Sequence, residues 1–199
     1  MKRFLIVAAV ILASATAFAQ HEAGEFTVQP RIGFSAADFN NTEDTKARVG
    51  LIVGPEFEYY LTNKFSLAGG LNYSQQGAEI DSKQLDATFK LDYLTVPIVA
   101  NFYVLKGLAL KAGIQPGFNL SGKIEGEVGS VKVSDDLDHV KSFDMAIPVG
   151  LSYEFKNFVL DARYTFGLTK IFEDKSSFHS LDSKNLTFQL TLGYKITLF

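Results

Sequence analysis

Three histidines, His21, His139 and His179, are the side chains of this sequence best suited to acid–base chemistry. Two of them have acidic or serine neighbours, namely Asp135, Asp136 and Asp138 before His139, and Asp174, Ser177, Ser180 and Asp182 around His179. A serine, a histidine and an aspartate could form a hydrolytic site if the folded chain brought them together. However, no serine lies in a nucleophile elbow, and these residue types are also ordinary in loops. We therefore expect no catalytic site and no enzyme activity.

The stretch SDDLDH, residues 134–139, contains three aspartates that could bind calcium. It lacks the glycine at the sixth position and the glutamate at the twelfth that a calcium loop requires, so we interpret it as a solvated acidic loop. No glycine-rich segment has the strand-to-helix context of a phosphate loop. The chain has no cysteine, which excludes a zinc–thiolate site and a cysteine nucleophile. We expect no metal and no cofactor.

A second group of chemically active side chains lies inside apolar segments rather than between them. Each member alternates with apolar residues, and the group comprises Arg31, Glu56, Glu58, Lys111, Asp144, Glu154, Asp161, Arg163 and Lys195. Four positive and five negative charges nearly cancel, as expected for a buried network of ion pairs. The alternative is a solvated surface of mixed charge. The choice depends on which face of each segment points inward.

Eight segments alternate between apolar and polar residues. They cover residues 26–36, 51–61, 65–73, 94–104, 108–120, 145–155, 158–168 and 188–198. Successive side chains of a strand point to opposite faces, so this alternation predicts β-strands with one apolar and one polar face. The helical spacing of apolar residues at i, i+3 and i+4 does not fit these segments.

The connections between these segments alternate in length. Short turns with asparagine or glycine are predicted at 62–64, 105–107 and 156–157, and longer polar stretches at 38–46, 77–90, 121–141 and 171–184. This alternation is typical of an up-and-down barrel with turns at one rim and loops at the other. We therefore predict an all-β fold, an eight-stranded antiparallel up-and-down transmembrane β-barrel. The longest loop, residues 121–141, is where we expect a protein partner to bind.

Glycine placement indicates that the polar face points into the barrel. The polar positions contain Gly33, Gly50, Gly54, Gly70, Gly113, Gly117, Gly150, Gly167 and Gly193, whereas the apolar positions contain Gly69. Glycine weakens a strand on a solvent face, but inside a narrow barrel it makes room for larger neighbours. The alternative is a soluble carrier barrel with an apolar interior. Aromatic residues at strand ends predict a girdle at the membrane interface, formed by Tyr59, Tyr60, Phe65, Phe102, Tyr103, Phe155 and Phe158.

Residues 1–19 have the features of a cleaved secretory signal peptide, because Lys2 and Arg3 precede an apolar run and Ala17-Phe18-Ala19 forms a cleavage site. A retained anchor is the alternative, but the apolar run is too short to span a membrane. We expect cleavage after Ala19 and one barrel domain over residues 20–199. The apolar strand faces predict location in the cell outer membrane, with the lipid bilayer as a partner. A net charge of −3 gives no indication of nucleic-acid binding.

The chain ends in NLTFQLTLGYKITLF, which resembles the C-terminal signal that outer-membrane barrels present to the barrel assembly machinery. The matching residues are Gly193, Tyr194, Ile196, Leu198 and the final aromatic residue Phe199. Phe199 lies one position beyond the usual spacing. The resemblance implies that the barrel assembly machinery is a partner of this chain.

Three longer stretches resemble the PorT-like outer-membrane β-barrel family of gram-negative bacteria. They are LDYLTVPIVANFYV with Pro97, ALKAGIQPGFNLSG, and FDMAIPVGLSYEFKNFVLDARYTFGLTKIFED with the segment 163–169. The resemblance covers nearly all of the chain after the signal peptide. It implies an eight-stranded outer-membrane barrel of the porin family and little about the task of the protein.

We expect a membrane-embedded structural or interaction protein with a plugged interior and external loops that contact a partner. Eight strands enclose an interior only just wide enough for side chains, and the nine charged residues would fill it. Two alternatives stay open. One is a small transport or ligand-binding barrel of the porin type, and the other is a membrane hydrolase with its site in the loops.

Overall fold

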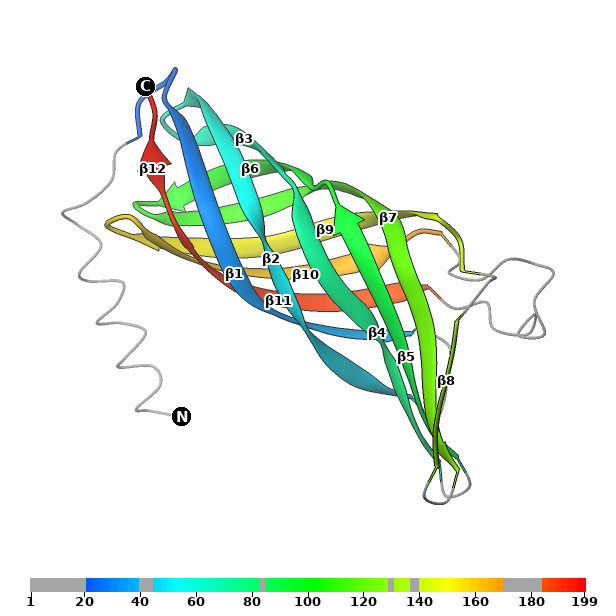
Figure 1. The fold of residues 1–199 in the computed structure, drawn as a ribbon. Helices are drawn as coiled ribbons and strands as arrows, with labels where there is room; N and C mark the ends of the chain where they lie inside the picture. Colours follow the sequence, from blue (N-terminus) through cyan, green and yellow to red (C-terminus); the bar gives the residue numbers. More distant parts are fainter. Residues whose placement is uncertain (1–20, 40–44, 83–84, 129–130, 137–139, 170–183) are drawn as a thin grey trace, which may run out of the picture.

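The computed structural model describes residues 21–39, 45–82, 85–128, 131–136, 140–169 and 184–199, and most of these residues form β-strands (Figure 1). The predicted signal peptide, residues 1–19, lies outside the described residues. In the described part of the chain, no helix is long and apolar enough to cross a membrane.

The strands of the described residues pair in antiparallel fashion throughout. They are β1 (Phe26–Phe39), β2 (Thr45–Thr62), β3 (Phe65–Gly70), β4 (Asn72–Ser82), β5 (Leu85–Thr95), β6 (Ile98–Leu105), β7 (Leu108–Val128), β8 (Val131–Asp136), β9 (Phe143–Phe155), β10 (Phe158–Gly167), β11 (Asn185–Tyr194) and β12 (Ile196–Thr197).

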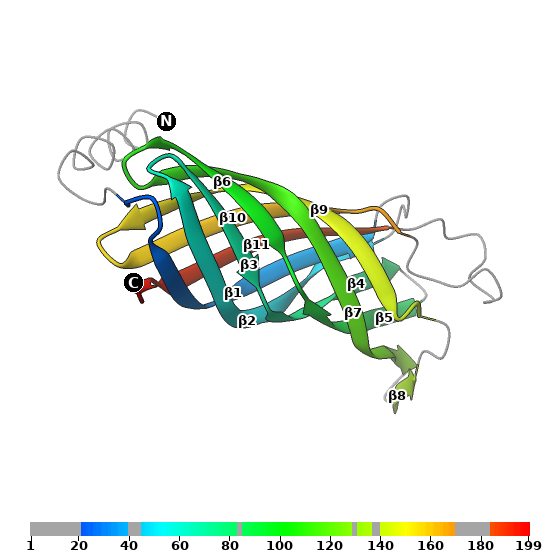
Figure 2. The same cartoon turned by 90° about the horizontal axis from the view of Figure 1, so that it is seen from above.

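These strands close into a ring (Figures 1 and 2). β1 pairs with β2 on one side and with β11 and β12 on the other, so the first and last strands of the chain join the two ends of the sheet. β3 and β4 share one position in the ring, β5 and β6 share the next, and β7, β9 and β10 complete it. The ring has eight strands, which confirms the predicted eight-stranded antiparallel barrel.

The breaks between β3 and β4 and between β5 and β6 lie side by side. Proline has no backbone N–H, and Pro97 lies between the last residue of β5 and the first of β6. The ladder nevertheless continues, because Gly70 N donates to the Pro97 carbonyl at 2.9 Å and Leu71 N donates to the Pro55 carbonyl at 3.0 Å. The ring therefore stays closed across both interruptions.

Apolar side chains cover the outside of the ring, and polar side chains fill it. Leu160 and Leu192 are 50% and 51% exposed, whereas their neighbours Asp161 and Thr191 are 1% and 3% exposed. The same contrast between adjacent residues recurs along β10 and β11. This confirms the prediction that the polar face of the strands points inward.

One rim of the barrel carries the short connections and both ends of the described chain (Figure 1). Turns join β2 to β3, β6 to β7, and β9 to β10, which confirms the three predicted tight turns. Backbone hydrogen bonds link the start of β1 to the end of the chain there. Phe26 N donates to the Phe199 carbonyl at 2.7 Å, and Leu198 N donates to the Phe26 carbonyl at 2.8 Å. We call this rim the turn end.

The opposite rim differs from the prediction. The stretches 77–90 and 121–141 were expected to be loops, but β4, β5 and β7 continue through most of them and β8 adds another strand. These extensions are polar on one face and lack the regular apolar stripe of a lipid-facing strand, which is why the sequence pattern suggested loops. Of the other predicted loops, residues 40–44 and 170–183 lie outside the described residues.

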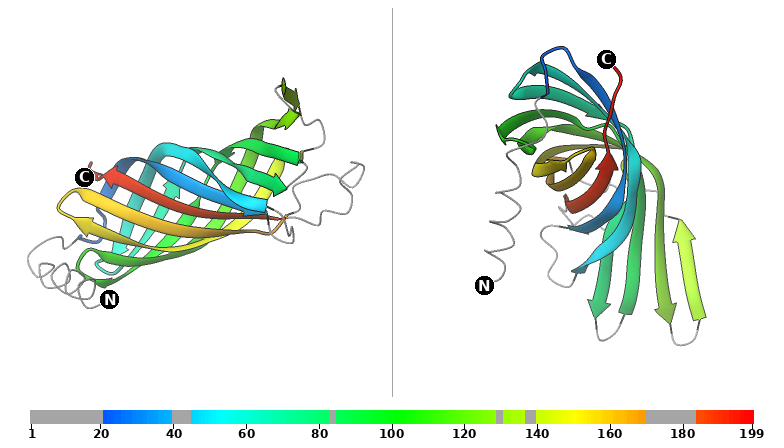
Figure 3. Two further views of the ribbon diagram at one scale, coloured as in Figure 1. Left: turned by 90° about the horizontal axis from the view of Figure 1, so that it is seen from below. Right: turned by 90° about the vertical axis from the view of Figure 1, so that its left-hand side faces the viewer.

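The extensions form a sheet that stands beyond the barrel rim (Figure 3). We call it the projecting sheet, and it comprises residues 77–82 of β4, 85–92 of β5, 121–128 of β7, and β8. On one edge of β7, pairing with β9 ends at Phe118, and pairing with β8 begins at Lys123. β8 therefore takes the place of β9 where the sheet leaves the barrel.

A β-bulge at Leu120 marks this departure. Tyr93 pairs with Asn119, but Asp92 pairs with Ser121, so Leu120 is an extra residue of β7. The extra residue shifts the alternation of β7, so side chains of the opposite parity lie on a given face of the sheet beyond the bulge. Beyond it, Ile124 packs against a cluster formed by Ala78, Phe89, Leu91 and Tyr93 on one face of the sheet, so the projecting sheet has a small apolar core of its own.

Candidate functional site in the barrel interior

Charged side chains from four strands meet in the middle of the barrel. This middle cluster consists of Arg31 on β1, Glu56 on β2, Lys111 on β7, and Asp161 and Arg163 on β10. All five side chains are buried, with exposures of 6% or less. Burial of a charge is costly unless an opposite charge and hydrogen bonds compensate it.

Glu56 is the centre of this arrangement. Its carboxylate accepts from Arg31 Nη1 at 2.7 Å, from Arg163 Nη2 at 2.6 Å and from Lys111 Nζ at 3.1 Å. Asp161 provides the second carboxylate, which accepts from Arg163 Nε at 2.8 Å and from Lys111 Nζ at 2.6 Å. Three cations therefore share two carboxylates. Arg31 and Lys111 bond to carboxylates on other strands, and Arg163 bonds both to Glu56 on another strand and to Asp161 on its own strand.

Glycines on the inner face leave room for these long side chains. A Cβ atom at Gly150 would lie 3.0 Å from Cγ of Arg163, and one at Gly70 would lie 3.5 Å from Nη2 of Arg31. Arg163 and Gly150 are cross-strand partners, so the arginine passes over the position where a side chain is missing. The inward glycines seen in the sequence have this physical reason at the middle cluster.

Several buried polar atoms beside the middle cluster have no hydrogen-bond partner within the described protein. They include Arg163 Nη1, Thr165 Oγ1, Gln189 Nε2 and Thr191 Oγ1. Arg163 and Gln189 are cross-strand partners on β10 and β11, so these groups share one wall of the interior. Buried polar groups of this kind usually bind ordered water, and we expect water along this wall.

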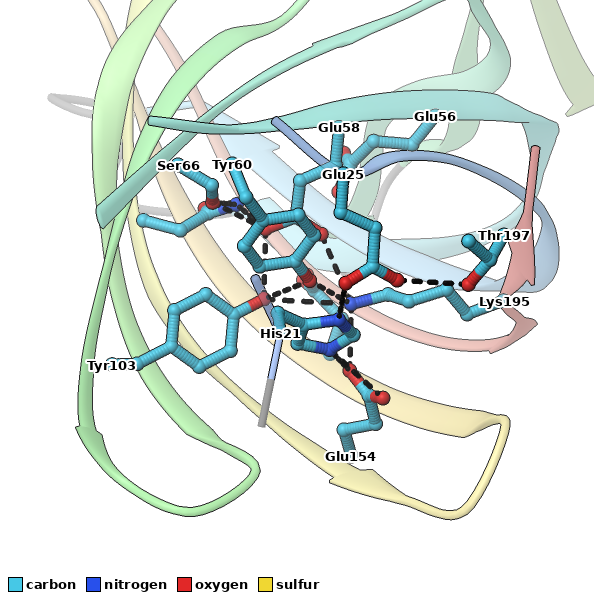
Figure 4. Close-up of polar contacts among 12 residues, drawn as sticks. His21, Glu25, Glu56, Glu58, Tyr60, Ser66, Tyr103, Glu154, Lys195 and Thr197 are labelled. Atoms are coloured by element: carbon cyan, nitrogen blue, oxygen red, sulfur yellow. Dashed lines mark hydrogen bonds and ion pairs between the residues drawn. The ribbon is translucent and has the colours of Figure 1, made fainter. Parts of the chain in front are cut away.

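A second group of charges lies nearer the turn end (Figure 4). This turn-end cluster consists of Glu58 and Tyr60 on β2, Tyr103 on β6, Glu154 on β9, and Lys195 between β11 and β12. Lys195 Nζ lies 2.6 Å from Glu154 Oε2, 3.0 Å from Glu58 Oε2 and 2.8 Å from Tyr60 Oη. Tyr103 Oη donates to Glu58 at 2.7 Å. With one ammonium group and two carboxylates, the turn-end cluster has one excess negative charge, which balances the one excess positive charge of the middle cluster.

His21 completes the turn-end cluster from outside the strands. Its ring stacks on Tyr60 with 4.1 Å between the ring centroids, and its Nε2 atom lies 3.1 Å from Glu154 Oε2. Burial lowers the pKa of His21, but the hydrogen bond and negative charge of Glu154 outweigh this effect, so the pKa is raised above 6.5. His21 is the second residue of the domain predicted over residues 20–199, and the sequence offers no signal for this contact.

The tyrosines of the turn-end cluster correct the predicted girdle. Tyr59 and Phe65 are exposed on the outside, at 44% and 37%, as an interfacial girdle requires. Tyr60 is fully buried, and its hydroxyl lies 2.8 Å from that of Tyr103. The assignment of Tyr60 and Tyr103 to the girdle was wrong, because they occupy inward positions on their strands.

Asp144 was predicted to belong to the same network as the other eight charges, and the structure places it elsewhere. It lies at the opposite end of β9 from Glu154, about 33 Å away along an extended strand. Its carboxylate accepts a hydrogen bond from the hydroxyl of Thr169. The alternation of the sequence assigns a side chain to a face of a strand, but it does not place it at a level along the barrel.

The candidate catalytic residues His139 and His179 lie outside the described residues, as do Asp138 and Asp174 and the segment 176–183 with its serines. Asp135 and Asp136 belong to β8 rather than to the expected acidic loop. Among the described residues, no group of three or more histidine, cysteine, aspartate or glutamate side chains could hold a metal ion.

The residues of the predicted assembly signal lie at the end of the last barrel strand. Tyr194, Ile196 and Leu198 point outward with exposures of 45%, 42% and 52%, whereas Gly193 faces Gln29 in the interior. The ring of Phe199 stacks on Phe26, with 5.4 Å between centroids. Recognition of these residues by the assembly machinery stays a prediction.

Comparisons with known proteins agree with this architecture. The family model described as "Outer membrane protein beta-barrel domain" matches residues 18–173. The crystal structure of Ail, the attachment invasion locus protein of Yersinia pestis, is similar at 21% identity with a TM-score of 0.52, covering 87% of this chain and 99% of that chain. Its complex with the heparin analogue sucrose octasulfate gives 20% identity and a TM-score of 0.52 over the same shares. A search of curated proteins found no match.

OprG from Pseudomonas aeruginosa is a more distant similarity, at 13% identity with a TM-score of 0.45, covering 88% of this chain and 97% of that chain. At such identities, solved structures support the fold alone, and the similarity to Ail supports a small closed barrel. The family match covers most of the chain and includes every strand of the middle cluster, whereas Lys195 of the turn-end cluster lies beyond it. The protein is therefore located in the cell outer membrane, and the chain belongs to the outer membrane protein β-barrel domain family.

Proposed function

We propose that this protein is a membrane-embedded anchor whose interior is plugged and whose projecting sheet contacts a partner outside the cell. The observation that carries the proposal is the middle cluster, in which Arg163 and Glu56 bridge opposite walls of the barrel. Side chains that bond to one another across the interior leave no continuous open path for a solute. We infer that the protein acts through its outer surface rather than through a channel.

The projecting sheet is the surface that best fits this role. The short turns of outer-membrane barrels face the periplasm and the longer connections face outward, so the projecting sheet stands outside the cell. Among the described strands, β8 pairs only with β7, which leaves the other edge of β8 available. A free strand edge presents backbone N–H and C=O groups that an extended segment of another protein can pair with.

The side chains of the projecting sheet and its base suit an aqueous setting. On the face opposite the apolar core, Lys90 Nζ lies 2.5 Å from Glu125 Oε2, and both side chains are partly exposed. Nearer the barrel, Tyr73 Oη donates to Asp92 at 2.9 Å. This surface carries both signs of charge, so we infer that the partner is a protein segment held mainly by backbone pairing rather than a strongly charged polymer.

Site-specific cross-linking in intact cells tests this proposal. A photoreactive amino acid at Lys132 or Ser134 on β8 should give a discrete adduct with a protein partner, whereas the same group at Leu110, on the lipid-facing side of β7, should not. A shortened hairpin that joins Lys123 to Asp136 through Asn-Gly should abolish capture without preventing barrel assembly, since these two residues are cross-strand partners. Equal labelling from Leu110, or none from either position on β8, would contradict the proposal.

We also propose that this chain is a PorT-like member of its family and is not an enzyme. The support for the first statement is the sequence resemblance around Pro97 and the segment 163–169, which contains Arg163 of the middle cluster. The support for the second is that the interior carboxylates and cations bond to one another, so their charges are already compensated within the barrel. Measurable hydrolysis by the purified protein, lost on substitution of His139 or His179, would overturn the second statement.

A further inference from the structure

The first described residues pass across the opening of the barrel at the turn end and are tied to it from several sides. We call residues 21–25 the N-terminal strap. Its backbone pairs with β2, because Gly24 N donates to the Tyr60 carbonyl at 2.7 Å and Tyr60 N donates to the Glu25 carbonyl at 2.9 Å. Thr197 Oγ1 donates to Glu25 Oε1 at 2.8 Å, which links the strap to β12. His21 makes the remaining link, to Glu154 on β9.

The two ring nitrogens of His21 each face a carboxylate (Figure 4). Nδ1 lies 2.9 Å from Glu25 Oε2, and Nε2 lies 3.1 Å from Glu154 Oε2. An ionised carboxylate only accepts hydrogen bonds, and a neutral imidazole has only one N–H group. Both contacts can be hydrogen bonds at the same time only when both nitrogens carry a proton, so the observed geometry requires the imidazolium ion.

The other groups that face the ring do not replace either contact. Lys195 is the nearby cation, and its Nζ atom is bound to Glu154 at 2.6 Å, so it shares that carboxylate with His21. Tyr60 stacks on the ring, and the ring of Tyr103 lies 5.9 Å from it, while Glu58 is bound to Lys195 and Tyr103. Two contacting carboxylates against one ammonium group favour the charged ring.

We propose that the start of the N-terminal strap is a pH-dependent latch on the periplasmic opening of the barrel, which protonated His21 holds closed on Glu154 and which loss of that proton releases, while the backbone hydrogen bonds of Gly24 and Glu25 with Tyr60 stay in place. Without the second N–H, one ring nitrogen would place a lone pair against a carboxylate at about 3 Å, which is repulsive. Release would open the turn-end cluster to water, while the middle cluster would still block the barrel. The latch goes beyond the proposed anchor function and does not depend on it.

The direction of the pH effect follows from the raised pKa of His21. A group whose pKa is higher in the folded state contributes stability that is complete below its unfolded value of 6.5 and is lost as pH rises through the folded value. Glu25 has a lowered pKa, because hydrogen bonds from Thr197 and His21 outweigh the effect of burial, so it stays ionised throughout this range. The latch should therefore be closed in mildly acidic conditions and should open with a midpoint above pH 6.5.

A single introduced tryptophan can report the state of the latch, because the chain has no tryptophan of its own. The mature protein with Tyr60→Trp, a buried position on which the His21 ring stacks, would be refolded in detergent, and acrylamide quenching would be measured between pH 5 and pH 9. Quenching should stay low at acidic pH and rise with a midpoint above 6.5. In the same background, Glu154→Gln should shift the midpoint down, and His21→Ala should give high quenching at every pH.

Two further measurements keep the result unambiguous. His179→Ala is the matched control, since it removes a histidine that is not in the strap, and its quenching curve should coincide with that of the parent. Each variant should also show an unchanged strand signal by circular dichroism, so that a change in quenching is not loss of the barrel. Quenching that does not depend on pH in the parent, or a step that persists in His21→Ala, would overturn the latch.

Discussion

Arg163 and Glu56, which are 107 residues apart in the sequence, form a two-point contact across the barrel, with Arg163 Nη2 at 2.8 Å from Oε1 and 2.6 Å from Oε2 of Glu56. β10 and β2 are not neighbours in the ring, so this contact crosses the interior instead of following the sheet. It joins two walls that backbone hydrogen bonds do not join directly. The pair therefore both fills the interior and braces the barrel.

Removal of Arg163 should destabilise the barrel. Arg163→Gln leaves Glu56 and Asp161 with fewer partners in a buried site, and breaking a buried ion pair from one side costs about 3–5 kcal/mol. We expect the variant to unfold at a lower temperature and a lower urea concentration than the parent. Unfolding would be measured by the heat-dependent change in gel mobility of the refolded protein. Lys106→Ala, at an exposed turn position, should leave both transitions unchanged. Equal stability of the Arg163 variant and the parent would show that the cluster does not brace the barrel.

The purified monomer should not form an open pore. The middle and turn-end clusters lie one behind the other in the interior, and their charges bond to one another. In planar bilayers, the protein should show no steady conductance of the size that a sixteen-stranded porin gives. Stable, large conductance steps would instead favour the transport alternative. If such steps disappeared when the protein was refolded at a lower concentration, they would come from an aggregate rather than from the monomer.

A charge on the lipid-facing side should impair assembly. Leu192 points outward from β11 and is 51% exposed, so arginine at this position would face lipid rather than the interior. A charged residue near the middle of the bilayer costs about 2–4 kcal/mol in a barrel. We expect Leu192→Arg to lower the folded fraction in lipid vesicles, with Leu192→Phe as an apolar control. Normal folding of Leu192→Arg would mean that this face does not contact lipid.

Loss of the last aromatic side chain should slow assembly in cells more than refolding in vitro. Phe199 is the final aromatic of the predicted assembly signal, and it also stacks on Phe26. Phe199→Ala would remove both features and keep the backbone hydrogen bond from Phe26 N, whereas Phe26→Ala removes the stacking and keeps the signal. If the assembly machinery recognises the signal, Phe199→Ala should reduce the amount of folded barrel in the outer membrane below that of Phe26→Ala, while the two proteins refold alike in detergent. Equal amounts in cells would indicate that Phe199 is not recognised.

Processing of the N-terminus can be measured directly. Cleavage after Ala19 would give a mature protein that begins at Gln20, one residue before the first residue of the N-terminal strap. Mass spectrometry of the protein extracted from outer membranes should show the loss of residues 1–19, and Ala17→Leu together with Ala19→Leu should prevent it. An intact mass for the parent protein would favour the retained anchor.

The class of fold and the inward direction of most charges could be predicted from local residue patterns. Side-chain direction in a strand depends only on parity, so the alternation around Asp161 and Arg163 places both in the interior without knowledge of their partners. The inward glycines point the same way, because the narrow interior requires small residues next to large ones. These inferences are local, and the structure agrees with them.

The length of the strands beyond the membrane was not visible in the sequence. In the projecting sheet, the bulge at Leu120 reverses the faces of β7, and polar residues such as Lys90 and Lys123 lie where a lipid-facing strand would be apolar. Once a strand leaves the bilayer, neither of its faces must be uniformly apolar, so the pattern that identifies barrel strands disappears. Residues 77–90 and 121–141 therefore resemble loops in the sequence although most of them are strands.

Which inward residues meet depends on how the strands are arranged in the closed barrel. The stagger between strands in the closed barrel sets the level of each side chain, and this stagger depends on ring closure rather than on any local pattern. It brings Arg163 to Glu56, separates Asp144 from both clusters, and places Tyr60 beside Lys195. The position of His21 depends on the same closure, because the opening that it covers exists only after β1 has paired with β11 and β12.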